Sequence, residues 1–219
     1  MQRLRITFYR GNELKYLSHL DVVRLWERAL RRSDIALAYS QGFHPHPRIS
    51  IAVPMPVGVT GDGELMDIWV TRKTSPYTLV KVMSEQLPQG IGIVNVAPVA
   101  LQLPSLQSIA RYAEYRVDMD TDKDCQAVDG SIQSLMERSE LSWEHQRDGE
   151  TRYYNLRALV KLLWVVGWNG PRCTLGMILK TDSEAAGRAE QVALALGFDE
   201  PPASIHRSRL FLVGDIIDR

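Results

Sequence analysis

The chain has 219 residues, of which 45% are hydrophobic and 24% are charged, and its formal net charge at pH 7 is zero. This is the composition of an ordinary globular protein, with material for one large hydrophobic core or two small ones. No apolar run approaches the roughly 20 residues that cross a bilayer, and the N-terminus lacks the charged head and apolar block of a secretory signal. We therefore expect a cytoplasmic protein.

Cysteine content limits the chemistry that the chain can hold. Its two cysteines, Cys125 and Cys173, form neither a disulfide framework nor the paired spacing of a zinc site. An iron–sulfur cluster is normally held by three or four cysteine thiolates, which this chain cannot supply. We therefore expect no cofactor in this chain, and any such cluster would belong to a partner.

The zero net charge hides an asymmetry along the chain. Residues 1–60 contain eight arginines and one lysine against four acidic residues, a net charge of +5, which leaves −5 for the rest. One end of the molecule is therefore basic, and a basic surface suits an anionic partner such as RNA.

The first 70 residues alternate between strand and helix patterns. Arg3 to Arg10 has an apolar residue at every second position, which is typical of a half-buried strand. The sequence Ser18-His-Leu-Asp21 has the form of a capping box and predicts a helix from about His19 to Arg32, with one apolar and one basic face. Alternating apolar residues predict two further strands, over 48–54 and 64–71.

Two more elements complete the first half of the chain. Ser75-Pro76 begins a helix that ends near Gln86, and a strand is expected over 91–99. The order βαββαβ over residues 1–100 predicts a ferredoxin-like N-terminal domain, in which two helices cover one face of an antiparallel sheet. Residues 101–110 are expected to form a linker with some apolar anchoring.

The same order of elements recurs over residues 111–219, which we predict to be a second, less regular ferredoxin-like domain. The stretch from Tyr153 to Val166 interrupts the repeat and is interpreted as a helix after a short strand. The fold class is therefore predicted to be α+β, with two ferredoxin-like (βαββαβ) units. The other elements expected in this half are strands over 113–119, 141–146, 172–180 and 204–213 and helices over 125–139 and 183–196.

The segment from Tyr39 to Ser50, which we call the motif loop, is the most informative stretch of the sequence. Gly42 is free to take a positive φ, and Pro45 and Pro47 hold the segment extended. This stiffening around several hydrogen-bonding side chains is what a preorganised binding site requires. The alternative is a proline-rich crossover whose polar side chains are merely solvated. The candidate binding residues of the motif loop are Tyr39, Ser40, Gln41, His44, His46 and Arg48.

Histidines are the candidates for acid–base chemistry. His44 and His46 would point to opposite sides of an extended segment, and no cysteine or third histidine lies nearby in the sequence, so we predict no metal site. His19, at the start of the first helix, could lie close to the motif loop, so that His19 together with His44 or His46 could serve in acid–base chemistry. The alternative for His19 is a role in capping or packing.

Basic residues form two candidate binding surfaces. Arg24 and Arg28 lie on the basic face of the first helix and, with Ser18 and His19 at its start, are candidate contacts to an anionic ligand. Alternatively, the basic face of this helix is an ordinary solvent-exposed surface that binds no ligand. A second basic edge is expected near the C-terminus, at His206, Arg207 and Arg209.

Common enzyme signatures are absent from the sequence. It contains no P-loop, no GxGxxG motif after a strand, no GxSxG nucleophile elbow and no HExxH helix. An enzyme would have to use a different constellation of residues.

A family resemblance is carried by three stretches of the first half: Tyr16-Leu-Ser-His-Leu-Asp-Val-Val-Arg-Leu-Trp-Glu-Arg-Ala-Leu-Arg-Arg32, Ala38-Tyr-Ser-Gln-Gly-Phe-His-Pro-His-Pro-Arg-Ile-Ser50 and Pro56-Val-Gly58. They closely resemble the bacterial radical-SAM-linked family, a domain found fused to a radical-SAM protein or encoded beside one. The family commonly has Asn where this chain has His44, whereas His46 matches the motif. The resemblance therefore favours His46 over His44, and the catalytic candidates are His19 and His46.

The resemblance implies an accessory protein of a radical-SAM enzyme. The iron–sulfur cluster and the S-adenosylmethionine would then reside in that partner. Three functions stay open on the sequence alone. The first is a binding module that presents an anionic substrate such as structured RNA to the partner. The second is a metal-independent RNA-processing or RNA-modifying enzyme with a histidine general base. The third is a purely structural partner subunit.

Overall fold

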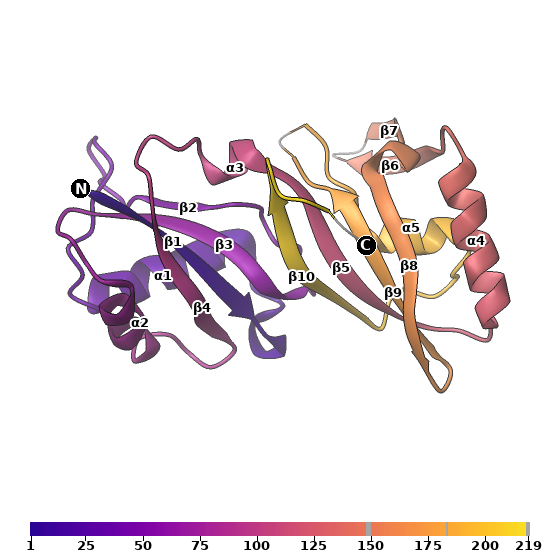
Figure 1. The fold of residues 1–219 in the computed structure, drawn as a ribbon, viewed down its shortest axis with the longest axis horizontal. Coiled ribbons are helices and arrows are strands. Elements are labelled where there is room, and N and C mark those ends of the chain that lie inside the picture. The colour runs from indigo at the N-terminus through magenta and orange to yellow at the C-terminus, as the bar shows by residue number, and fades with distance from the viewer. Residues whose placement is uncertain (148–149, 183, 218–219) are drawn as a thin grey trace. The chain divides into compact units, whose positions relative to one another are not determined.

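A computed structural model describes residues 1–147, 150–182 and 184–217. The chain is a mixed α+β protein, as expected, and it divides into two compact units (Figure 1). The first unit combines Met1–Ala110 with Leu212–Arg219, and the second comprises Arg111–Phe211. None of the described helices has both the length and the apolar character needed to cross a membrane.

The first unit has the order βαββαβ. Its strands are all antiparallel: β4 pairs with β1, β1 with β3, and β3 with β2, so that the fourth strand lies beside the first. A 3-10 turn (Asn12–Leu14) precedes the first helix, and a short helix, α3 (Leu106–Ile109), follows the last strand. The main elements are β1 (Gln2–Arg10), α1 (His19–Arg32), β2 (Ile49–Ile51), β3 (Thr60–Val70), α2 (Pro76–Ser84) and β4 (Ile91–Val99).

Both long helices of this unit pack on the same face of its sheet. The alternate residues Leu4, Ile6 and Phe8 of β1 are buried in one core with Trp26 of α1 and Leu79 of α2. Phe8 and Trp26 meet edge to face, with ring centroids 5.2 Å apart. The predicted alternation of β1 is therefore confirmed. The apolar face of α1 is confirmed at Trp26, Ala29 and Leu30 but not at Leu20, which the spacing placed on that face and which is exposed, whereas Val22 is buried.

The predicted capping box at the start of α1 is also present. The Asp21 backbone N–H donates to Ser18 Oγ over 3.2 Å, and the Ser18 hydroxyl donates to Asp21 Oδ2 over 2.6 Å. These bonds satisfy one of the free amides of the first turn and fix the point at which the helix begins.

Residues 101–110, expected to be a linker, pack against the other face of this sheet. The Arg3 guanidinium donates to the carbonyl oxygens of Leu103 and Pro104, and Leu106 is fully buried. The Gln107 amide donates to the Ile51 carbonyl over 2.9 Å. The segment is therefore anchored, as its apolar residues indicated, and belongs to the first unit.

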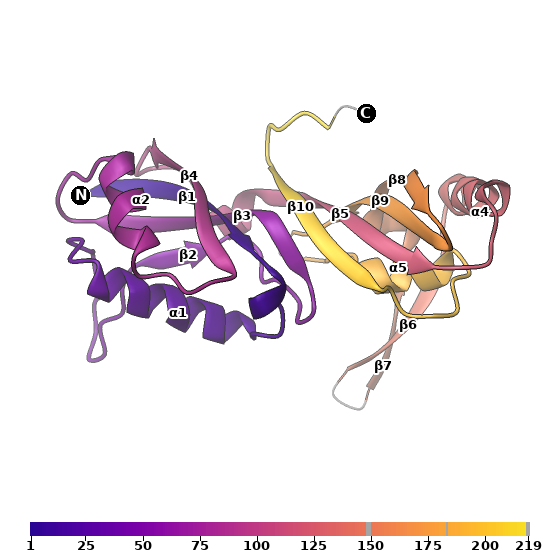
Figure 2. The same cartoon turned by 90° about the horizontal axis from the view of Figure 1, so that it is seen from below.

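The second unit has a sheet of the order β10-β5-β9-β8 and a separate two-stranded sheet, β6-β7. When the β6-β7 hairpin is set aside, the order of elements and the order of strands are those of the first unit. Figure 2 shows the hairpin extending away from the rest of this unit. The elements are β5 (Ala110–Asp120), α4 (Cys125–Glu137), β6 (Ser142–Arg147), β7 (Glu150–Asn155), β8 (Val160–Asn169), β9 (Arg172–Lys180), α5 (Ala189–Ala195) and β10 (Ser204–Leu212).

The prediction of a helix within Tyr153 to Val166 was wrong. This stretch forms the end of β7, a 3-10 turn (Arg157–Leu159) and most of β8, which pairs along its length with β9. A short apolar run does not distinguish helix from strand by its period, and its valines and tryptophans suit an edge strand beside β9. The helix predicted over 183–196 is shorter, because α5 begins at Ala189; position 183 lies outside the described residues.

Candidate functional site

The motif loop is closed on itself by a small set of hydrogen bonds. Tyr39 and Pro47 form an isolated antiparallel bridge. The Ser40 N–H donates to the His46 carbonyl over 2.8 Å, and the His46 N–H donates to Ser40 Oγ over 3.0 Å. Gly42 takes a φ of 136°, a value that side chains disfavour, and so permits the turn at the tip. Glycine and proline therefore give the loop a defined shape, as the sequence indicated.

The tip of the loop presents its side chains to solvent. Gln41 and His44 are exposed, and Phe43 is completely exposed at 103% of its reference area. Tyr39, at the base of the loop, is also exposed. Phe43 was missed by the sequence reasoning, which weighed only the polar residues of the loop. The signal was present, because an aromatic residue between Gly42 and Pro45 has little opportunity to enter a core.

Arg48 leaves the loop and stacks on Trp69 of β3. Its guanidinium carbon lies 4.8 Å from the indole ring centroid, and that of Arg3 lies 5.0 Å from the same ring. The backbone holds this end of the loop in register, since the Arg48 N–H donates to the Ala38 carbonyl and the Trp69 N–H to the Arg48 carbonyl. Trp69 thus positions Arg48, a role that the sequence did not reveal.

His46 joins the loop to the middle of α1. Its Nδ1 lies 3.8 Å from Glu27 Oε1. Residues three and four apart are neighbours on a helix, so Arg24, Arg28 and Arg31 form a continuous ridge beside Glu27; all three are exposed. We call these three residues the arginine ridge. The structure therefore brings the predicted arginines and the motif loop together on one surface of the first unit.

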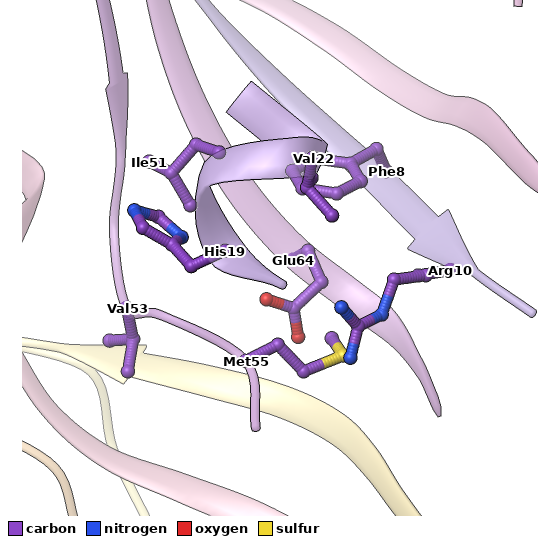
Figure 3. A pocket seen from close by; sticks show the side chains of 8 residues that line it. All are labelled: Phe8, Arg10, His19, Val22, Ile51, Val53, Met55 and Glu64. Atoms are coloured by element: carbon purple, nitrogen blue, oxygen red, sulfur yellow. The ribbon is translucent and has the colours of Figure 1, made fainter. Parts of the chain in front are cut away.

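His19 lies apart from that surface. It is eight residues before Glu27, which corresponds to about 12 Å along the helix axis. The structure therefore does not pair His19 with His46. Instead, His19 lines a small pocket at the start of α1, shown in Figure 3. The other lining residues are Phe8, Arg10, Val22, Ile51, Val53, Met55 and Glu64.

The pocket contains a buried arginine and a buried glutamate. Arg10 is 2% exposed and donates to the carbonyl oxygens of Leu17, Pro56 and Val59, which ties together the segments around the pocket. Glu64 is 1% exposed. Figure 3 shows its carboxylate pointing toward the Arg10 guanidinium. The free volume, about 10 Å³, is the space needed by one water molecule.

The environment keeps His19 neutral. Partial burial, and after it the positive charge of Arg10, lowers the pKa of His19 below its ordinary value of 6.5. A neutral imidazole offers one hydrogen-bond donor and one acceptor and is the form that can accept a proton. Among the described residues, no group of three or more His, Cys, Asp or Glu side chains is arranged to hold a metal ion.

The second predicted basic edge is divided between the faces of β10. Arg207 is buried at 1% exposure, His206 is half-buried, and Arg209 is exposed and stacks on Phe211 at 4.7 Å. Alternation along a strand places Arg207 and Arg209 on one face and His206 on the other. The three residues therefore do not form one exposed basic surface.

Comparison with known families gives one match that covers most of the chain. Residues 3–189 match the family described as "Uncharacterized protein conserved in bacteria (DUF2344)". That description mentions no radical-SAM protein, so the link to such an enzyme stays a prediction. No curated protein matches the chain.

Chains from three solved complexes are similar to this chain. A chain of the "Crystal Structure of a Cbf5-Nop10-Gar1 Complex" has a TM-score of 0.52 at 11% identity, covering 94% of this chain and 48% of that one. Chains of the archaeal box H/ACA sRNP Nop10-Cbf5 complex and of an H/ACA RNP bound to a substrate RNA containing 2'-deoxyuridine have TM-scores of 0.48 and 0.47, at 12% and 13% identity. Each of these two matches covers 94% of this chain and 47% of the other chain. The chain thus spans about half the length of the chains that it matches, and at 11% identity the first match shows a likeness of fold alone.

Proposed function

We propose that this chain, which belongs to the bacterial DUF2344 family, is a binding module that presents structured RNA to a radical-SAM partner enzyme. The observation that carries the proposal is the surface on which the arginine ridge and the motif loop lie together, joined by the contact between His46 and Glu27. The chain itself binds and the partner supplies the catalysis.

The charges of this surface favour an anionic ligand. Arg24, Arg28 and Arg31 are exposed, and Arg24 is only loosely paired with Asp21 at 3.6 Å. Exposed ion pairs of this kind are weak, so the arginine remains available to a phosphate group. Arginine also binds phosphate through two parallel hydrogen bonds.

The aromatic residues of the surface favour RNA with unpaired bases over other anions. Phe43 at the tip of the loop and Tyr39 at its base are exposed, and His46 joins this loop to the helix that carries the ridge. Aromatic rings next to arginines are the usual platform for stacking bases of single-stranded loops. The ligand class that fits best is therefore a stem–loop, whose stem contacts the ridge and whose loop reaches Phe43.

The partner follows from the resemblance of the Tyr16–Arg32 and Ala38–Ser50 stretches to the radical-SAM-linked family. The partner would contain the iron–sulfur cluster and S-adenosylmethionine, and the two proteins would meet in the cytoplasm. In the same proposal, both units are ferredoxin-like. The support is the βαββαβ order and the placing of the fourth strand beside the first, found in the first unit and repeated in the second around the inserted β6-β7 hairpin.

The test of RNA binding compares two double variants. Arg24→Ala/Arg28→Ala removes two charges from the ridge, and Arg72→Ala/Lys81→Ala removes two exposed charges from elsewhere in the same unit. Binding to a fluorescent RNA stem–loop is measured by anisotropy between 50 and 200 mM salt, both chosen as experimental conditions. We expect the ridge variant to bind more weakly and its log–log salt slope to fall by about 2, whereas the control variant changes little.

Two results would overturn the RNA proposal. The first is the absence of binding by the wild-type protein at the lowest salt concentration, and the second is an equal loss of affinity in both double variants. The partner is tested separately by affinity purification of the tagged chain from bacterial cells and identification of the bound proteins. Recovery of a radical-SAM protein is expected, and its absence from repeated purifications would contradict that part.

A further inference from the structure

The pocket beside His19 is built for a neutral ligand group. Its charged members are the Arg10 guanidinium and the Glu64 carboxylate, whose opposite charges compensate each other, and its third polar member is a neutral histidine. A phosphate or carboxylate would be placed next to Glu64, and an ammonium group next to Arg10. Because the attraction to one of these two charges is offset by the repulsion from the other, neither ion would recover the hydration that it loses in a site of such low exposure.

The size of the pocket restricts the ligand further. Its free volume of about 10 Å³ accommodates one water molecule and nothing larger. Five apolar side chains form the rest of the wall: Phe8, Val22, Ile51, Val53 and Met55. A ligand group that enters the pocket therefore loses its contacts with water, and its hydrogen bonds must be made by the three polar residues of the pocket.

The hydrogen-bonding capacity of the pocket matches a hydroxyl group. Glu64 offers acceptors, and the neutral ring of His19 offers one donor and one acceptor. A hydroxyl both donates and accepts and has the size of a water molecule. Figure 3 shows the His19 ring and the Glu64 carboxylate among the side chains that line the pocket.

We propose that this pocket binds a ribose 2'-hydroxyl of the RNA, so that it reads the sugar while the arginine ridge reads the phosphates. This inference rests on the proposed function. The pocket lies at the start of α1, the helix that carries the ridge. Lys15 and Tyr16 precede this helix in the sequence, Lys15 Nζ lies 5.3 Å from the centroid of the Tyr16 ring, and Tyr16 is largely exposed. A nucleic acid strand on α1 would find a cation and an aromatic ring beside the pocket. The 2'-hydroxyl is the group by which proteins distinguish RNA from DNA.

The experiment uses two stem–loops of one sequence, one of plain RNA and one with 2'-O-methyl groups throughout. The methyl group removes the hydroxyl donor and exceeds the volume of the pocket, while the phosphates and bases are unchanged. We expect wild-type protein to bind the methylated stem–loop roughly 5- to 10-fold more weakly, the equivalent of one net hydrogen bond. His19→Phe should bind both probes equally, at about the affinity of the wild type for the methylated probe.

A second variant keeps the test independent of any folding defect in His19→Phe. Val53→Ala enlarges the pocket without removing a polar group, so it should tolerate the methyl group and reduce the difference between the two probes. Equal binding of both probes by the wild type, or the same difference in all three proteins, would overturn the inference and leave the proposed RNA binding intact. Failure of the proposed function itself would give a different result, because the wild-type protein would then bind neither probe.

Discussion

His46 Nδ1 lies 3.8 Å from Glu27 Oε1, and this contact places the motif loop against the middle of α1. Glu27 is the acidic residue within the arginine ridge, three residues after Arg24 and four before Arg31. Its carboxylate therefore has two effects, since it holds the loop when His46 is protonated and repels a phosphate backbone. The two effects can be separated by removing only the charge.

Glu27→Gln keeps the size of the side chain and its ability to accept a hydrogen bond. Because the ridge gains one net positive charge, we expect tighter binding of the RNA stem–loop and a log–log salt slope steeper by about 1. The measurement is the anisotropy titration across salt concentrations. Weaker binding would show that Glu27 acts mainly by holding the loop, contrary to this prediction.

A second prediction concerns the buried ion pairs of β1 and β3. Asp67 is fully buried and accepts hydrogen bonds from Arg3 Nε at 2.8 Å and from Arg5 Nε at 2.9 Å. Asp67→Ala leaves Arg3 buried without its carboxylate, which should cost about 3–5 kcal/mol of unfolding free energy. Urea unfolding followed by circular dichroism measures the loss.

The matched control for this prediction is Asp120→Ala. Asp120 also pairs with an arginine, Arg172, at 2.7 Å, but both side chains are about half exposed. Water screens this pair, so its removal should change the urea midpoint only slightly. Equal losses in the two variants would contradict the argument from burial.

The regular elements could be predicted where a local pattern determined them. The alternation of β1 and the capping box of α1 were sufficient, because burial follows a period of two in a strand and a serine cap fixes the first turn of a helix. The stretch that became β8 could not be identified, since its position depends on pairing with β9, a long-range contact that leaves no clear period in this mainly apolar stretch.

The candidate site was predictable in composition but not in arrangement. The sequence indicated Arg24, Arg28, His46 and Arg48, and the structure places all four on the first unit, as parts of the ridge and the loop. The sequence could not show that His19 lines one pocket with Arg10 and Glu64, because these residues come from three separate elements. Nor could a strand pattern reveal that Trp69 supports Arg48.

The pH dependence of stability gives a third prediction. Burial and the nearby Arg10 lower the pKa of His19 in the folded chain, so the unfolded chain takes up a proton as pH falls through 6.5 while the folded chain does not. Stability from this group is therefore complete above pH 6.5 and is lost as pH falls from there through the folded-state pKa. His19→Gln should flatten this part of the curve of urea midpoint against pH.

A fourth prediction concerns the packing of β8 on β9. Gly176 is buried directly across from Trp164, and a Cβ at Gly176 would overlap the indole ring. Gly176→Ala should therefore displace the ring and cost about 1–3 kcal/mol. Gly167→Ala is the control in the same sheet, because a Cβ there meets nothing within 4 Å. A thermal melting temperature equal to that of the control would contradict the prediction.

The last prediction separates base stacking from charge. Phe43 is completely exposed, so Phe43→Ser should leave the melting temperature unchanged. If the ring stacks on an unpaired base, the variant should lose roughly 1–3 kcal/mol of binding energy for the stem–loop. Its salt slope should stay that of the wild type, because no charge is removed. Tyr77→Ser, which removes an exposed aromatic ring from α2 of the same unit, should bind normally. Full affinity in Phe43→Ser would show that the ridge binds the RNA backbone without a stacked base.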